Sequence, residues 1–407
     1  MAGTMGITTK VSSGKMTPTK IALYVLLALS LVVLPIIFEG LGMLFMTRIL
    51  ALVGLYVMLA LGLNIVVGYA GLLDLGYIAF YAIGAYSGVI VGAQAMKAMP
   101  DGLQPYTYFL MIPVAAAFAA LAGVTLGTPV LRLRGDYLAI VTLGFGEIVR
   151  IIINNNALGI TNGAAGLPRA GEFLPTPAGL EWLQSNALFS IPGVFENGFN
   201  FAFSSNLYWY YVIVLLCCLT IFVVRRLNDS RLGRSWIAMR EDEVAASSMG
   251  VSIVSAKLWA FSLGAVWGGI AGLTFANFQQ FVSPESFTFM ESVFVVCTVV
   301  IGGMGSIPGA IVGALLIQGT PELIRGFAAS GMISGLSGEQ VTAISNYRNL
   351  VFGLAMVLMM IWRPQGLIPS KRRAAELTAD EDIMEEENET LYDIQHDTGR
   401  FGDSADQ

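Results

Sequence analysis

Polar and charged side chains inside long apolar stretches are the residues of this chain that could act on another molecule. Asn64 and Asp74 flank a glycine-containing turn, and Glu147 and Arg150 lie three residues apart. Ionisable residues at membrane depth mark solute or ion pathways, so we expect brief contact with a small polar solute. A self-neutralising pair is the alternative for Glu147, because residues three apart meet on a helix. We expect no catalytic residue and no metal site, since the single histidine, His396, lies in an acidic tail and the three cysteines lack ligand spacing.

Glycine interrupts three of the apolar stretches. They read VVGYAGLLDLG (66–76), TLGFGEIVR (142–150) and VVIGGMGSIPGAIVG (299–313). Irregular backbone at membrane depth survives only against protein or a water-filled cavity, so broken helices indicate a solute path. Close helix packing is the alternative explanation of each glycine. The candidate residues of the path are Asn64, Gly68, Gly71, Asp74, Gly144, Gly146, Glu147, Gly302 and Gly305.

The elements that position these residues are predicted to be membrane-spanning helices. The 407 residues are 55% hydrophobic and 12% charged, with a mean hydropathy of +0.70, which excludes an ordinary soluble domain. We predict an all-α polytopic membrane protein with about ten helices, some of them glycine-broken or re-entrant. The expected spans are 21–38, 49–67, 75–96, 107–130, 138–155, 207–224, 257–277, 288–303, 308–325 and 347–362.

The distribution of charge predicts the orientation. Lys and Arg gather in alternate connections, around Lys10 to Lys20, Arg132, Arg225 to Arg240 and Lys371. By the positive-inside rule these segments are cytoplasmic, and both termini with them. The expected organisation is a cytoplasmic segment at 1–20, a transmembrane domain at 21–370 with an outer loop at 156–206 and an inner loop at 225–256, and an acidic, disordered cytoplasmic tail at 371–407.

The inner loop carries a pattern suited to a protein partner. Glu241 to Glu243 would form the first turn of a short helix, where negative charge is favoured, and Gly250 would end it in the left-handed conformation. The residues predicted on one side are Val244, Ala245, Ser248 and Met249. Such a face fits a groove on another protein, with a solvated amphipathic loop as the alternative.

Several motifs, in order from about residue 45 to 370, resemble one family. The coupling-loop positions Gly233, Arg234, Arg240, Glu241, Asp242, Glu243, Ala245, Ala246 and Gly250 are similar to the cytoplasmic coupling loop of bacterial ABC importer permeases. More narrowly, they resemble branched-chain amino acid permease subunits of the LivM type. GDYLAIVTLGFGEIVRIIINN (135–155), TNGAAGL (161–167), VVIGGMGSIPGAIVGA (299–314) and WRPQGLIP (362–369) resemble the same family.

The resemblance implies an ABC importer permease fold in the bacterial inner membrane. It implies four kinds of partner: a second, LivH-like permease subunit, two ABC ATPase subunits on the coupling loops, a periplasmic amino-acid-binding protein and membrane lipid, with no nucleic acid. Leucine, isoleucine or valine would be the substrate. The chain has no phosphate-binding loop, because Gly14-Lys15 is followed by Met16 and lacks the upstream glycine. We therefore expect a non-enzyme with no cofactor of its own, with ATP and Mg used by the partners.

Three alternatives remain at this point. Related permeases handle urea, short amides or other amino acids. A stand-alone secondary transporter would also use broken helices. The third alternative, a non-transporting scaffold, leaves the glycine breaks unexplained. A weak internal repeat relates Val67 to Gly71 with Ile301 to Gly305, each expected at an inner turn.

Overall fold

The computed structural model describes residues 18–100, 107–130, 136–156, 159–168, 190–191, 199–200, 205–329, 350, 353–359, 361–363 and 365–369. Residues 1–17 of the predicted N-terminal segment, most of the outer loop 156–206, much of the last expected span and the predicted acidic tail lie outside them. The longer helices are α1 (Pro18–Gly40), α2 (Leu44–Asn64), α3 (Ile78–Ala98), α4 (Thr107–Val130), α5 (Asp136–Asn154), α7 (Ser205–Asn228) and α10 (Ile253–Gln279).

The prediction of an all-α polytopic membrane protein is confirmed. Within the described residues, seven helices are long and apolar enough to cross a membrane. The expected span 288–303 corresponds to α11 (Phe289–Gly302), a helix of 14 residues. At about 1.5 Å per residue it reaches only about 21 Å, less than the roughly 30 Å of the hydrocarbon core. The re-entrant alternative therefore suits α11 better than a full span.

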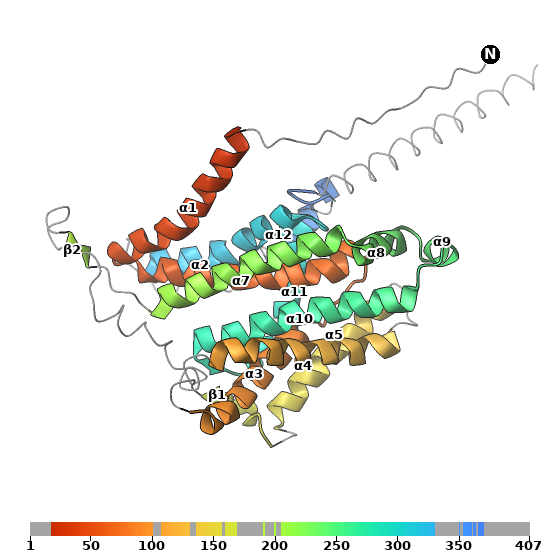
Figure 1. Cartoon of the computed structure of the whole chain (residues 1–407), viewed down its shortest axis with the longest axis horizontal. Coiled ribbons are helices and arrows are strands. Elements are labelled where there is room, and N and C mark those ends of the chain that lie inside the picture. The colour runs from red at the N-terminus through yellow and green to blue at the C-terminus, as the bar shows by residue number, and fades with distance from the viewer. Residues whose placement is uncertain are drawn as a thin grey trace, which may run out of the picture.

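The helices form two layers that run along the long axis of the molecule (Figure 1). One layer holds α2, α7 and α12 (Ile307–Ala314), and the other holds α3, α4 and α5, with α10 between them. Helix α10 packs against α2, α3 and α4, and α2 packs against α7. The short helices α8 (Arg231–Glu241) and α9 (Glu243–Ser248) lie at one end, whereas the described strands lie toward the other.

The strands within the described residues are four two-residue pieces outside the long helices. β1 (Leu167–Pro168) pairs antiparallel with β4 (Phe281–Val282), and β2 (Ser190–Ile191) pairs with β3 (Phe199–Asn200). Two 3-10 turns, η3 (Gly163–Ala165) and η5 (Pro284–Phe287), flank the first pair. These pieces tie the connection after α5 to the connection after α10.

Small residues set the distance between α3 and α10. A Cβ atom on Gly84 would lie 2.2 Å from the carbonyl oxygen of Gly269, and one on Gly272 would lie 2.0 Å from that of Tyr81. Lipid supplies no hydrophobic force between helices, so close backbone approach and van der Waals contact hold them together. Close helix packing therefore explains the glycines between α3 and α10.

Two of the three glycine clusters lie at helix breaks. The prediction for the third was wrong, because α5 runs through Gly144 and Gly146 without interruption. Helix α2 passes into a π-helical turn, η1 (Ile65–Tyr69), and α3 begins only at Ile78. Helix α11 turns through Gly303 to Gly305 into α12, which passes into a second π-helical turn, η6 (Leu315–Gly319), and then α13 (Thr320–Ala329). The two breaks predicted as inner turns meet, because the backbone N–H of Gly305 donates to Asn64 Oδ1 at 2.8 Å.

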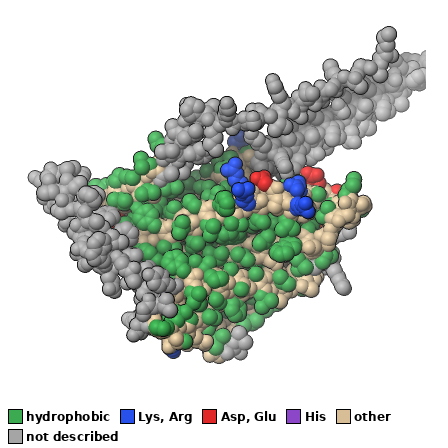
Figure 2. All heavy atoms as spheres, viewed as in Figure 1, with side chains coloured by type: hydrophobic (Ala, Val, Ile, Leu, Met, Phe, Trp, Pro, Cys, Tyr) green, Lys and Arg blue, Asp and Glu red, His purple; other side chains and the backbone are tan. Residues whose placement is uncertain are grey.

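The molecular surface fits a lipid environment. In Figure 2 hydrophobic side chains cover the middle of the visible face, and the charged side chains of the described residues gather mainly toward the α8 and α9 end. Exposed apolar residues of the spans include Leu121, Leu215 and Phe222. A lipid-facing belt with charge at its edge is the expected surface of a multi-pass membrane protein.

We predict that Gly272→Val lowers the melting temperature of the detergent-solubilised protein by several degrees. The side chain would meet the Tyr81 carbonyl of α3, and overpacking of this kind typically costs about 1–3 kcal/mol. Gly144→Ala is the matched control, because an added Cβ there meets nothing within 4 Å and alanine favours a helix. Fluorescence-detected size-exclusion chromatography after heating measures both, and equal stability of the two variants would contradict the packing role.

Candidate functional site

The inner loop is largely helical, which differs from the prediction of one short helix. Helix α7 continues to Asn228, and α8 follows after a two-residue turn. Ser230 caps α8, since its Oγ accepts the Gly233 backbone N–H at 3.2 Å. A Cβ on Gly233 would lie 2.3 Å from the Leu227 carbonyl oxygen, so glycine allows the sharp turn between the helices. The segment RLGRSWIAMRE is polar on average because of its charged residues, so a search for apolar spans did not reveal α8.

Helix α9 begins at Glu243 rather than at Glu241, with Asp242 as its N-cap. Glu241 ends α8, and Asp242 Oδ1 accepts the backbone N–H groups of Ala245 at 3.0 Å and Val244 at 2.7 Å. These two hydrogen bonds lower the pKa of the exposed Asp242 carboxyl below its ordinary value. The prediction for Glu241 was wrong, because the chain uses the middle acid as the N-cap. The predicted left-handed Gly250 is confirmed, with φ of +85°.

Three contacts fasten the two short helices to α10. Lys257 Nζ lies 2.7 Å from Glu243 Oε1, and the lysine side chain is only 4% exposed. Trp236 Nε1 donates to the Ala256 carbonyl at 2.8 Å. Ala246 is buried against the body of the chain. Sequence reasoning missed Lys257 and Trp236, although a lone lysine at the start of the apolar run 257–277 was a signal that the position lies at a boundary.

The remaining residues of α9 face outward. Val244 is 62% exposed and Met249 is 88% exposed, and Ala245 and Ser248 are exposed as well. The residues predicted to share one side, Val244, Ala245, Ser248 and Met249, are thus all exposed, with Met249 as the C-cap residue of α9. An apolar face on a fixed helix outside the lipid belt is available to a partner. Of the proposed contact residues, Ala246 does not belong to this face.

Arg240 and Arg234, on the same helix, make different contacts. Arg234 Nη1 donates to the Asp229 carbonyl at 3.1 Å and is exposed. Arg240 Nη1 donates to the Gly68 carbonyl in η1 at 2.7 Å. The stem of Arg240 lies against Gly71, whose φ is +70°. The structure thus brings a coupling-loop candidate and two path candidates together.

Asn64, Gly68 and Gly305 form a compact cluster beside Arg240. Asn64 is fully buried, and a Cβ on Gly68 would lie 2.0 Å from Asn64 Oδ1 and 2.6 Å from the backbone nitrogen of Gly305. Within the described residues, Asn64 Nδ2 is buried without a hydrogen-bond partner. Gly302 belongs to the neighbouring α11–α12 turn, where a Cβ would lie 2.1 Å from the Gly309 carbonyl oxygen.

Asp74 lies in the irregular segment between η1 and α3, against α5. Its Oδ1 accepts the Gly76 N–H at 2.9 Å, and the Leu75 N–H donates to Thr142 Oγ1 at 3.1 Å. A Cβ on Gly146 would lie 3.3 Å from the Cα of Gly76. Among the described residues, the second carboxylate oxygen of Asp74 is buried without a hydrogen-bond partner. Asp74 and Gly146 are therefore neighbours, a short distance from the Arg240 cluster along the chain.

Glu147 and Gly144 lie on the more exposed side of α5. The predicted pairing of Glu147 is confirmed, since Arg150 Nη2 lies 2.8 Å from Glu147 Oε2. Both side chains are about a third exposed, at 31% and 33%. Gly144 borders a shallow depression with Phe145 and Ile148. These two candidates are not brought into the Asn64 or Asp74 clusters.

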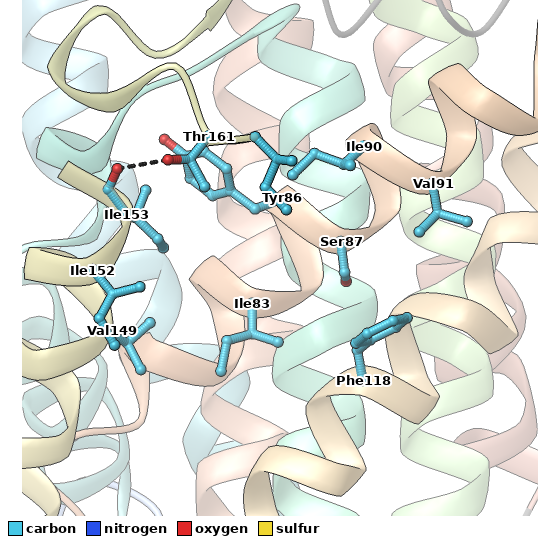
Figure 3. A pocket seen from close by; sticks show the side chains of 11 residues that line it. Ile83, Tyr86, Ser87, Ile90, Val91, Phe118, Val149, Ile152, Ile153 and Thr161 are labelled. Atoms are coloured by element: carbon cyan, nitrogen blue, oxygen red, sulfur yellow. Dashed lines mark hydrogen bonds between the residues drawn. The ribbon is translucent and has the colours of Figure 1, made fainter. Parts of the chain in front are cut away.

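A pocket between α3, α4 and α5 was not predicted from the sequence. It holds about 300 Å³ and is lined by apolar side chains with the hydroxyl-bearing Tyr86, Ser87 and Thr161. Figure 3 shows Phe118 on one side of it and Ile83, Val149 and Ile152 on the other, while Thr161 donates to the Ile153 carbonyl at 2.8 Å. Apolar residues in spans carry little sequence signal for a pocket, because lipid-facing residues look the same.

Comparison with known proteins identifies the family. Residues 45–360 match the family model described as the permease component of the branched-chain amino acid transport system. The chain is 46% identical over 321 residues to the high-affinity branched-chain amino acid transport system permease protein LivM of Escherichia coli (strain K12), covering 78% of this chain and 68% of that protein.

More distant relatives cover similar lengths. The probable LivM permease of Methanocaldococcus jannaschii is 25% identical over 351 residues, covering 80% of this chain and 93% of the relative. The LivH permease of Escherichia coli (strain K12) is 24% identical over 322 residues, covering 77% and 91%. No solved structure matches the chain. The chain belongs to the branched-chain amino acid transport permease family, whose members are membrane transport subunits and not enzymes.

Proposed function

We propose that this chain is one of two membrane subunits of an ATP-driven importer and that ATPase subunits dock on α9. The observation that carries the proposal is the exposed face of Val244 and Met249 on a helix fastened to the membrane body by Lys257. A docking element must be fixed if force on it is to move the helices behind it. ATP and Mg belong to the partners, and α8 and α9 lie on the cytoplasmic side with both termini, in the bacterial inner membrane.

Branched-chain amino acids are the proposed substrates. The LivM and LivH relatives, which are named as branched-chain amino acid permeases, support this choice at 46% and 24% identity. A periplasmic binding protein would deliver the solute, and membrane lipid would surround the complex. Uptake of urea, short amides or other amino acids is the competing outcome. Competition of each compound against radiolabelled leucine in vesicles with all partners present distinguishes these classes.

The second permease subunit is proposed to cover the exposed side of α5. Ile140, Gly144, Glu147 and Ile151 recur at helical spacing along that side, and both isoleucines are exposed. A charged pair within a span almost always faces a bundle interior or a water-filled cavity. Glu147 and Arg150 are a third exposed in this chain alone, so a LivH-like partner would complete that interior and the path.

We expect Met249→Glu to abolish co-purification of the ATPase subunits, with a loss of affinity of roughly tenfold or more. A charge on the apolar docking face leaves a buried, unpaired group in the interface. Met249→Leu is the matched control and keeps binding, because leucine preserves the apolar contact. Pull-down from membranes that contain all subunits measures both. Full ATPase binding by the glutamate variant would contradict docking on α9.

We expect the double variant Glu147→Gln, Arg150→Gln to lower leucine uptake roughly tenfold, because charge-assisted contacts to a zwitterion would be lost. The matched control is Glu322→Gln, Arg325→Gln, which neutralises another i,i+3 pair at 3.0 Å on α13 and leaves uptake unchanged. Reconstituted vesicles with the complete transporter measure both variants. Uptake at the wild-type rate in the Glu147→Gln, Arg150→Gln variant would show that Glu147 only neutralises Arg150.

A single reconstitution tests the proposed function as a whole. Vesicles that contain this chain, its sister permease, the ATPases and the binding protein should take up leucine only with ATP. Vesicles that contain this chain alone should take up none. Gradient-driven uptake by the isolated chain would support the stand-alone transporter and overturn the proposal.

A further inference from the structure

Arg240 connects the docking helices to a helix break. Its side chain leaves the C-terminal end of α8, runs along Gly71 and ends at the Gly68 carbonyl, 2.7 Å from Nη1. A Cβ at Gly71 would lie 2.6 Å from Arg240 Cγ. Because Gly71 has no side chain, there is room beside it for the aliphatic part of the Arg240 side chain.

The Gly68 carbonyl lies in the last turn of a helix, where carbonyl groups have no partner within the helix. It lies in the π-helical turn η1, and π-helical turns inside α-helices are frequent at functional sites. A guanidinium donor to a carbonyl is a charge-assisted hydrogen bond, stronger than one between neutral groups. Arg240 thus holds an irregular backbone in one arrangement.

The same glycine touches the second helix break. The Cα of Gly68 faces Asn64 and the backbone nitrogen of Gly305, and Asn64 Oδ1 accepts that N–H at 2.8 Å. A shift of the Gly68 peptide would therefore disturb the α11–α12 turn as well as η1. The contacts run without interruption from α8 through Gly68 to Gly305.

The other end of the α8–α9 unit is fastened to a different helix. Lys257 pairs with Glu243, and Trp236 donates to Ala256, both at the start of α10. Force applied at α9 is thus divided between α10 and the Arg240 contact. Helix α10 packs along α2 and η1, whereas the Arg240 contact ends at a hydrogen bond to the irregular backbone itself.

We propose that Arg240 is a positioning residue that transmits movement of the coupling helices to the two helix breaks, rather than a contact for the ATPase. This inference rests on the proposed function, because it takes α9 as the docking element. It assigns Arg240 a role inside the membrane body, distinct from that of the outward-facing Glu241 beside it.

The test measures coupling rather than activity alone. In the complete reconstituted transporter, Arg240→Gln keeps most of the stem and removes the guanidinium. We expect the ATPases to remain bound and ATP hydrolysis to continue, while leucine taken up per ATP hydrolysed falls roughly tenfold or more, as expected for loss of a charge-assisted bond. Arg240→Lys should fall between this variant and the wild type, since lysine keeps the charge without the planar fork.

Arg231→Gln is the matched control, because Arg231 lies on the same helix, is exposed and does not belong to the coupling-loop positions; its uptake per ATP should equal the wild-type ratio. A wild-type ratio in Arg240→Gln overturns the proposal, and so does an equal fall in both variants. If Arg240→Gln lowers the yield of the complex, the test uses the leucine taken up per ATP hydrolysed by the Arg240→Lys variant instead. Failure of the wild-type chain to bind ATPases would overturn the proposed function instead, so the two failures are distinguishable.

Discussion

The constraint on which this structure depends is the need to satisfy backbone polar groups where helices break at membrane depth. Lipid provides no partner for a free N–H or C=O. The chain meets this need with side chains from distant segments: Asn64 accepts the Gly305 N–H, and Arg240 donates to the Gly68 carbonyl. Each helix break is thus hydrogen-bonded to another element of the chain. The irregular backbone that marks the candidate path therefore also requires these contacts.

Glycine has two separate roles in this arrangement. At Gly84 and Gly272 it sets the separation of α3 and α10, which is a packing role. At Gly71 and Gly305 it permits φ of +70° and +77° in the turns themselves. Glycine thus serves close packing at some residues and turn geometry at others, while the solute path stays a prediction. Gly68 serves packing, because it lies in a π-helical turn and is in close contact with Asn64.

Local sequence patterns predicted the helices, whereas the long-range contacts between the helices could not be predicted from the sequence. Hydropathy located the spans, and two of the three glycine clusters located breaks, because each signal lies within one segment. The cluster at Gly144 and Gly146 failed, since α5 continues through it. The Asn64–Gly305 and Arg240–Gly68 bonds join residues 241 and 172 positions apart, and nothing local specifies such pairs. Arg240 was grouped with its acidic neighbours because α8 was not predicted, and only that helix directs its side chain inward. Asp242, in contrast, was close to its predicted place.

The length of α9 explains why the anchors beneath it matter. A helix of six residues is far below the roughly 12–15 residues at which an isolated helix becomes marginally stable in water. Its position therefore comes from the Asp242 cap, the Glu243–Lys257 pair and the buried Ala246, rather than from its own hydrogen bonds. A docking element that exists only through its anchors cannot absorb a displacement by bending. The displacement passes to what the anchors hold, and on the α8 side that is the π-helical turn at Gly68.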